Sequence, residues 1–149
     1  MTQKCFRNPK NCSPIVKYQI FRIVVLNRIE AQEIAERISN ISRYIRFAGV
    51  INSNGKLIAY IRRMGLKPLL NTKKTRNQFS HLATQRGMTV QFNRQLGNVK
   101  FLWEEREKVQ TISFGLGKNT AWISIDKNVV RSEVLRIIDN CLPIVKHYQ

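Results

Sequence analysis

The residues best suited to chemistry in this sequence are clustered cations. Lysine and arginine side chains bind phosphate oxygens through charge-assisted hydrogen bonds. A helix beginning near residue 72 would add free backbone N–H groups to the same surface. Tyr44 and Tyr60 lie in the same stretch and could offer rings on which nucleic-acid bases stack. We therefore predict an anion-binding surface formed by Arg43, Arg46, Arg62, Arg63, Lys67, Lys73, Lys74 and Arg76.

The whole chain is strongly cationic, with 26 Lys and Arg against 9 Asp and Glu and a net charge of +17 over 149 residues. From Arg37 through Phe101 there are thirteen Lys or Arg and no acid, so half of the cations have no local partner. Repulsion of this size destabilises a compact chain unless anions offset it. RNA or DNA bound without strong sequence specificity is the main interpretation, and an anionic membrane surface is a weaker one.

The sequence has no arrangement of residues that is typical of an enzyme. His81 lies in a basic segment and His147 lies far along the chain, so we do not expect the two to share a site. The segment Gly115–Thr120 resembles a phosphate-binding loop in composition, but it lacks the required spacing and falls between expected strands. We predict a turn there. The sequence thus indicates a non-enzymatic protein without a cofactor.

Acidic residues and cysteines are the remaining candidates for a metal site. Cations alternate with the glutamates of Glu104–Lys108, which favours a solvated charged strand over a metal site. Cys5, Cys12 and Cys141 have no further ligands at metal-binding spacing, and their odd number does not indicate a disulfide framework. No signal peptide is recognisable, and the apolar run Ile20–Leu26 is too short to cross a bilayer. We expect no metal and a cytoplasmic protein.

The element that must position the cations is a hairpin between Ile45 and Arg63. Two runs rich in β-branched and aromatic residues flank Asn52-Ser53-Asn54-Gly55, and Asn-Gly supplies the left-handed backbone that a tight turn needs. Before the hairpin, apolar residues recur at helical spacing from Asn27 to about Ser42. This helix is expected to turn its isoleucines toward the core: Ile29, Ile34, Ile38 and Ile41.

A second helix should follow the hairpin, beginning at Asn71 or Thr72 and running to about Leu96, with Gly97 as its stop. Gly87 weakens the middle of this helix, so a kink there stays open. Its inward residues would be Phe79, Leu82, Ala83, Phe92 and Leu96.

Three strands and a final helix complete the expected structure. The strands are Val99–Leu102, Val109–Phe114 and Thr120–Asp126. In the last of them, Ala121, Ile123 and Ile125 alternate with Thr120, Trp122 and Ser124. The final helix is Val129–Leu142, and Pro143 is expected to end it.

The resulting order is α-β-β-α-β-β-β-α, which predicts an α+β sandwich with a five-stranded antiparallel sheet and helices packed on it. We assign residues 27–149 to this single domain and residues 1–26 to a basic N-terminal arm. Whether residues 15–26 are helix or strand stays open.

This order, with a glycine-turn hairpin directly after the first helix, resembles the roadblock-like domain of the profilin and longin superfold. Between about Asn40 and Lys127 the amino-acid sequence also resembles that of an uncharacterised archaeal family. The blocks that carry this resemblance are residues 45–51, 55–59, 65–70, 95–97 and 106–109. The resemblance implies a roadblock-like sandwich that forms a homodimer through sheet edges or long helices. It also implies a platform for small GTPases or larger assemblies.

Three functions are therefore open. The main hypothesis is a non-enzymatic roadblock-like module whose basic surface binds nucleic acid. The alternative is a homodimeric protein-interaction scaffold or small-GTPase regulator whose charge meets an acidic partner. A third hypothesis is peripheral attachment to anionic lipid through the N-terminal arm.

Overall fold

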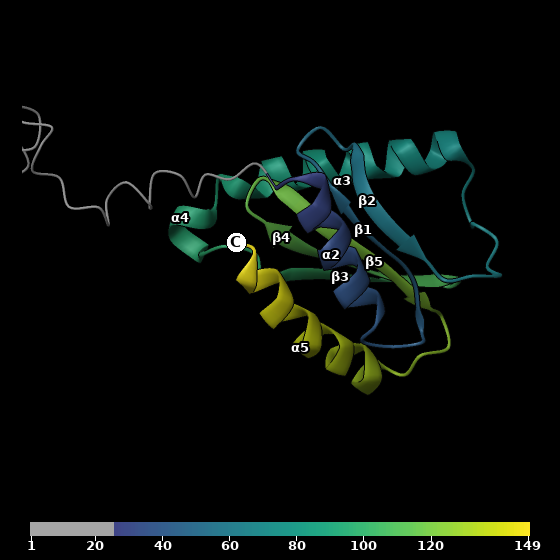
Figure 1. The fold of residues 1–149 in the computed structure, drawn as a ribbon. Coiled ribbons are helices and arrows are strands. Elements are labelled where there is room, and N and C mark those ends of the chain that lie inside the picture. The colour runs from purple at the N-terminus through teal and green to yellow at the C-terminus, as the bar shows by residue number, and fades with distance from the viewer. Residues whose placement is uncertain (1–25) are drawn as a thin grey trace, which may run out of the picture.

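The computed structural model describes residues 26–149, in which five strands form one open sheet. The strand order is β2-β1-β5-β4-β3, and every neighbouring pair is antiparallel. Helices α2 and α5 pack on one face and α3 packs on the other (Figure 1). The predicted element order and α+β sandwich are confirmed. The predicted basic arm lies outside the described residues, apart from Leu26.

Helix α2 (Arg28–Ser39) begins at a capping box. The backbone N–H of Glu30 donates to the Asn27 side chain (2.8 Å), and the Asn27 N–H donates to the Glu30 carboxylate (3.1 Å). Ile34 and Ile38 are buried as expected. Ile29 is 79% exposed, contrary to expectation. Ile34 lies five positions further along the helix, and a rotation of about 140° over those positions turns Ile29 away from the sheet.

The hairpin is formed by β1 (Ile45–Ile51) and β2 (Leu57–Arg62), as the Asn-Gly signal predicts. The Asn52 side chain accepts hydrogen bonds from the backbone N–H groups of Asn54 and Lys56, both at 2.9 Å. Gly55 has a φ of 79°, which only glycine adopts without strain. The turn is therefore encoded within its own few residues.

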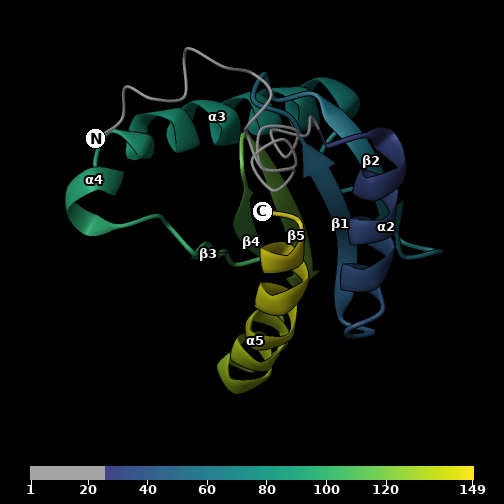
Figure 2. The same ribbon diagram turned by 60° about the vertical axis from the view of Figure 1, so that its left-hand side comes forward.

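The second helix is shorter than expected and is followed by a separate turn of helix. Helix α3 spans Thr72–Val90, and α4 spans Asn93–Leu96. Phe92 and Leu96 are 53% and 82% exposed, so the prediction that they face inward is wrong. The helix breaks beyond the sheet, where α4 has no sheet surface to cover (Figure 2).

The C-terminal half supplies β3 (Phe101–Glu105), β4 (Val109–Leu116) and β5 (Asn119–Asp126). Strand β5 lies in the centre and pairs with β1 on one side and β4 on the other. Its alternation is as predicted, since Ala121, Ile123 and Ile125 join the core beneath α2 and α5.

Helix α5 (Arg131–His147) runs through Pro143 instead of ending there. Pro143 cannot donate a hydrogen bond to the Asp139 carbonyl and crowds it, but both residues are exposed, so that carbonyl can hydrogen-bond to water instead. About half a turn before and half a turn after Pro143, Cys141 and Val145 are buried against the sheet. Tertiary packing therefore keeps the chain helical past the proline.

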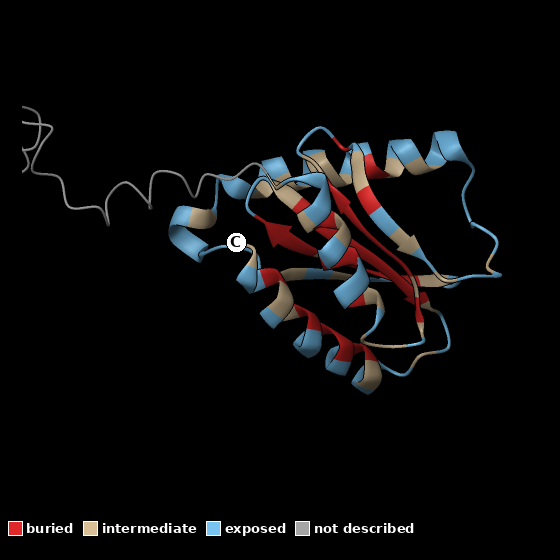
Figure 3. Cartoon of the chain, in the orientation of Figure 1, coloured by how far each residue is buried: buried red, intermediate tan, exposed pale blue. Residues whose placement is uncertain are grey.

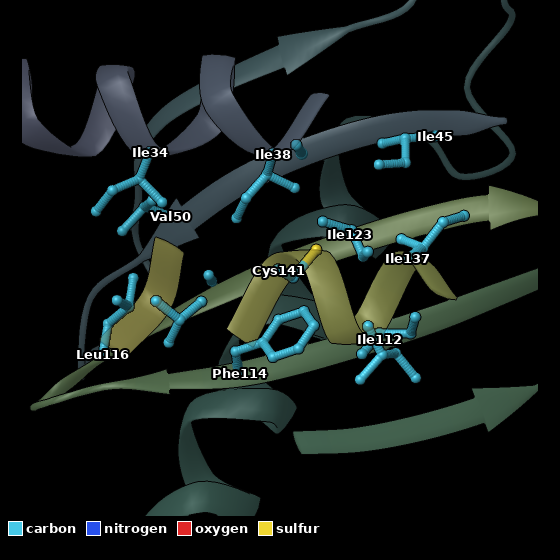
Figure 4. Packing of buried hydrophobic residues seen from close by; sticks show 14 of the residues in the cluster. Ile34, Ile38, Ile45, Val50, Ile112, Phe114, Leu116, Ile123, Ile137 and Cys141 are labelled. Carbon is cyan, nitrogen blue, oxygen red and sulfur yellow. The ribbon is translucent and has the colours of Figure 1, made fainter. Parts of the chain in front are cut away.

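Two hydrophobic clusters lie on the two faces of the sheet. The larger fills the space between the sheet and helices α2 and α5, where Ile38, Phe114 and Ile137 are fully enclosed (Figure 4). The smaller holds α3 to the other face through Phe47, Ile51, Phe79 and Trp122. Helix α3 buries only Phe79, so most of its surface is open to solvent (Figure 3).

Candidate interaction surfaces

The structure distributes the eight predicted cations over separate places, and two of them share one carboxylate. Asp126 at the end of β5 lies between Arg46 and Arg63. Its Oδ1 is 3.0 Å from Arg46 Nη1, and its Oδ2 is 3.0 Å from Arg63 Nη2. This carboxylate is far from both arginines in sequence, and only the pairing of β1 with β5 brings it there. These two arginines therefore hold strand ends together.

Arg43 lies next to this group and contacts Arg63. The Arg63 guanidinium donates a hydrogen bond to the Arg43 carbonyl oxygen. The Arg43 guanidinium lies 5.2 Å from the centre of the Tyr44 ring, and its hydrogen bond to the Tyr44 hydroxyl raises the pKa of Arg43. Arg43 is exposed, and its charge remains available on the surface.

Arg62, Lys67 and Arg76 lie along a groove between β2 and α3. Two adjoining hollows of about 100 and 520 Å³ make up this groove, and Arg62 borders both. Lys67 borders the first hollow and Arg76 the second. We call this the β2–α3 groove; Phe47, Arg62, Pro68, Leu70, Thr75 and Phe79 line both of its hollows.

Lys73 and Lys74 are exposed in the first turn of α3 and do not line the groove. The Asn71 side chain accepts a hydrogen bond from the Lys74 backbone N–H at 2.9 Å. One of the backbone donors expected to bind phosphate is thus already used as a helix cap. The helix start and the two lysines remain a solvated surface.

Aromatic rings form the floor of the β2–α3 groove. Phe47 stacks with Tyr60, with centroids 5.5 Å apart, and Trp122 lies edge-on to Phe47 at 5.6 Å. The Arg62 guanidinium lies 5.6 Å from the Phe47 centroid. Tyr60 is 51% exposed, so it offers apolar surface to a ligand.

Exposed apolar residues gather at the opposite end of the molecule. The C-terminal end of α3, α4 and the following strand carry side chains that are between 40% and 82% exposed. Figure 2 shows α4 projecting beyond the sheet on the side where β3 lies. The sequence did not indicate this strip, because Phe92 and Leu96 were expected to face the core. We call it the apolar strip; it consists of Met88, Val90, Phe92, Leu96, Val99 and Leu102.

Strand β3 is a terminal strand of the sheet, and one of its sides is unpaired. The Arg106 N–H donates to the Val109 carbonyl. Hydrogen-bonded positions recur at every second residue of an antiparallel strand, so residues 102 and 104 also direct their N–H and C=O groups toward β4. Phe101, Trp103 and Glu105 therefore direct theirs outward. Such an edge can pair with another strand.

Catalytic or metal-binding groups do not come together in the part of the chain that the structure describes. Residues 26–149 contain no cluster of three or more His, Cys, Asp or Glu that could hold a metal ion. Burial raises the pKa of the Cys141 thiol to about 12, so this cysteine is not a nucleophile. Within the same residues, no helix combines the length and apolar character needed to span a membrane. The non-enzymatic role and cytoplasmic location stay predictions.

Comparison with solved structures identifies the architecture as the roadblock fold, in agreement with the resemblance of the sequence. The Roadblock/LC7 domain from Streptomyces avermitilis is 8% identical, with a TM-score of 0.57 over 78% of this chain and 92% of that one. Myxococcus xanthus MglB is 12% identical, with a TM-score of 0.59 over 79% and 93%. MglB with a tetrameric arrangement is 15% identical, with a TM-score of 0.56 over 82% and 92%.

No family model matches the sequence, and neither does any curated protein. At these identities the similarity is one of fold, and the archaeal resemblance stays a prediction. Function must therefore be argued from the surfaces of this chain.

Proposed function

We propose that the protein is a homodimeric interaction module of the roadblock type, in which β3 of one copy joins β3 of a second. The observation that carries this proposal is the coincidence of an unpaired strand with the apolar strip. Backbone groups of Phe101, Trp103 and Glu105 offer hydrogen bonds, and the apolar strip offers surface that water wets poorly. One structure of similar fold is described as MglB with a tetrameric arrangement, which agrees with assembly from copies.

A second copy is the occupant that fits the strip best. Six of the exposed large hydrophobic residues lie within residues 88–102, which is the largest such group; a smaller one, Tyr60, Leu69 and Leu70, lies at the β2–α3 groove. In an antiparallel pair centred on β3, the strips of both copies would lie on the same face of the joined sheet. One contact would then cover both of them.

The test is the mass of the protein in solution, measured by light scattering after gel filtration. We expect twice the chain mass of 17.4 kDa for the wild type. In the double variant Leu96→Glu with Leu102→Glu, four carboxylates would meet across the contact, and we expect a monomer. Both side chains are at least 40% exposed, so the fold should survive.

Leu135→Glu is the matched control, since Leu135 is 48% exposed on α5 and lies outside the strip. It should remain a dimer. A wild type that is monomeric at every concentration tested, or a double variant that stays dimeric, would refute the proposed contact.

The partner of such a module is proposed to be a protein. The sequence resemblance makes a small GTPase the first class to test, by co-purification that persists after nuclease treatment. Nucleic acid has less support, because Arg46 and Arg63 are already engaged by Asp126, which offsets one of their two charges. Binding of labelled RNA that vanishes with added salt would restore that hypothesis.

A further inference from the structure

The β2–α3 groove has the features of a binding site for an extended chain. Its larger hollow lies along β2, and its smaller hollow extends beneath residues 66–70 toward Thr111 of β4 and Trp122 of β5. Strand β2 is the terminal strand at the opposite edge of the sheet from β3 (Figure 1). Helix α3 forms its far wall through Thr75, Arg76 and Phe79. The larger hollow therefore runs beside a strand edge.

The backbone of β2 leaves hydrogen-bonding groups free on that edge. The Arg63 N–H donates to the Arg46 carbonyl. Hydrogen-bonded positions recur at every second residue, so residues 61 and 59 also direct their N–H and C=O groups toward β1. Tyr60 and Arg62 consequently direct their N–H and C=O groups away from β1. No backbone partner for these groups exists among residues 26–149. An added strand would supply one.

The groove is cationic along its whole length. Lys56, Arg62, Lys67 and Arg76 border it, and none of them forms an ion pair within the described part of the chain. No carboxylate lines either hollow. The glutamates of α2 belong to the other face of the sheet, which that helix covers. A ligand in the groove must therefore be anionic.

The groove also requires apolar side chains from its ligand. Tyr60 and Leu69 are 51% and 54% exposed, and Leu70 and Phe47 continue the apolar surface into the groove. Side chains of an added strand point alternately to the two faces of the sheet. Every second residue of the ligand would thus descend between β2 and α3, where rings and aliphatic side chains receive it.

We propose that the β2 edge binds an acidic, extended segment of a partner protein as a sixth strand of the sheet. Backbone hydrogen bonds at Tyr60 and Arg62 would hold its main chain, and the groove cations would select its carboxylates. This goes beyond the proposed homodimer, which uses the β3 edge. Both contacts can exist at once because they lie at opposite ends of the sheet.

Charge excludes two other occupants of the groove. A second copy would have to approach through its own β2 edge, because the proposed homodimer uses the acidic β3 edge. It would then bring its β2 cations against the same four side chains, and like charges placed opposite each other are destabilising. Residues 1–25 contain five Lys or Arg and no acid, so they would be repelled as well. The anionic ligand must come from another molecule.

The first experiment is to pan a random dodecapeptide phage library against the immobilised full chain. We expect enriched peptides with net negative charge and apolar residues at alternate positions. Enrichment of neutral or basic peptides, or no enrichment, would overturn the proposal. The most enriched peptide is then synthesised and titrated into isotope-labelled protein. Its amide shifts should be largest at Tyr60 and Arg62, and shifts centred on another element would overturn the proposal equally.

Charge reversal supplies the second experiment. Arg62→Glu with Lys67→Glu should weaken the synthetic peptide by about tenfold or more, because two attractions become repulsions. Lys118→Glu with Lys127→Glu is the matched control, made at two exposed cations outside the groove, and should change affinity by less than about twofold. Equal losses in both variants would overturn the proposal in favour of a general charge effect.

Two controls separate this site from the other hypotheses. A twelve-nucleotide single-stranded DNA that displaces the peptide and binds more tightly would replace the proposal with a nucleic-acid surface. The mass of each variant is measured in parallel: a monomer that still binds the peptide refutes only the dimer, and a dimer that does not bind it refutes only this inference.

Discussion

At the scale of single residues, Asp126 binds two of the arginines that the sequence suggests are free to bind a ligand. Strand β1 is irregular between Ile45 and Phe47, so Arg46 is an extra residue in the pairing with β5. A bulge of this kind redirects a side chain. Here it accompanies the contact of Arg46 with a carboxylate that Arg63 also binds. The alternation of the sequence gives no sign of this arrangement.

Cys141 is predicted to be unreactive in the folded protein. The residue is fully buried, and burial raises the pKa of its thiol from 9.0 to about 12. At pH 8 the thiolate fraction is therefore about a thousandfold lower than in the unfolded chain. Alkylation with iodoacetamide, followed by mass spectrometry of the peptide that contains Cys141, should show labelling only after denaturation.

The raised pKa also predicts how stability changes with pH. The folded state disfavours the Cys141 thiolate, so the folded protein is most stable relative to the unfolded chain while the thiol is protonated. This contribution is complete below about pH 9 and is lost as the pH rises toward 12. The free energy of unfolding should fall more between pH 9 and pH 11 in the wild type than in Cys141→Ala. Equal losses would show that the thiol does not titrate differently in the two states.

At the scale of elements, the contact between α3 and the β1–β2 turn makes a prediction about Gly55. A Cβ at this position would lie 2.7 Å from the Ser80 Cα, which belongs to the backbone of α3. Gly55→Ala should therefore cost the backbone strain of about 1–3 kcal/mol at positive φ, plus about 1–3 kcal/mol for the clash. Urea denaturation measures the sum.

Gly65 provides the matched control for that prediction. Its φ is 78°, almost the same as the 79° of Gly55, but a Cβ there would have no neighbour within 4 Å. Gly65→Ala should lose only the strain component. If both variants lose the same free energy, then α3 does not rest firmly on the turn.

The elements also show which parts of the fold the sequence could predict. The hairpin and β5 depend on local signals, an Asn-Gly turn and the alternation of Ala121, Ile123 and Ile125 with their neighbours, and both were predicted correctly. The path of α5 past Pro143 depends on burial of Val145, and the exposure of α4 depends on where the sheet ends. Such outcomes are decided by packing between distant segments, which no local pattern contains.

The same distinction applies to the candidate surfaces. Arg62, Lys67 and Arg76 were predicted as cations near one another, and the structure brings them to one groove. The ion pair of Arg46 with Asp126 and the outward-facing backbone of Tyr60 could not be predicted, because both follow from strand order. Sequence reasoning thus identified charged residues better than it identified which of them remain free.

At the scale of the whole molecule, the net charge of +17 predicts that salt stabilises the protein. Ions screen repulsion between surface cations, with a screening length of about 8 Å at physiological ionic strength. The melting temperature should rise by about 2–4 °C between low and physiological salt, which corresponds to about 1 kcal/mol in a chain of this size. Thermal denaturation monitored by circular dichroism at several NaCl concentrations measures this.

A melting temperature that falls with salt would contradict that expectation. It would mean that favourable ion pairs, such as the one at Asp126, outweigh the repulsion. Repeating the measurement with Asp126→Asn separates the two effects, since the variant keeps the repulsion and loses the pairs.

The central position of β5 has a consequence for how the chain acquires its structure. Phe47 pairs with Ser124, and Gly49 pairs with Trp122, so the middle of the sheet joins segments from the two ends of the domain. Closing so long a loop is entropically costly, whereas the β1–β2 and β4–β5 hairpins need only short ones. We expect each hairpin to form early and independently, and their docking along the β1–β5 boundary to set the folding rate.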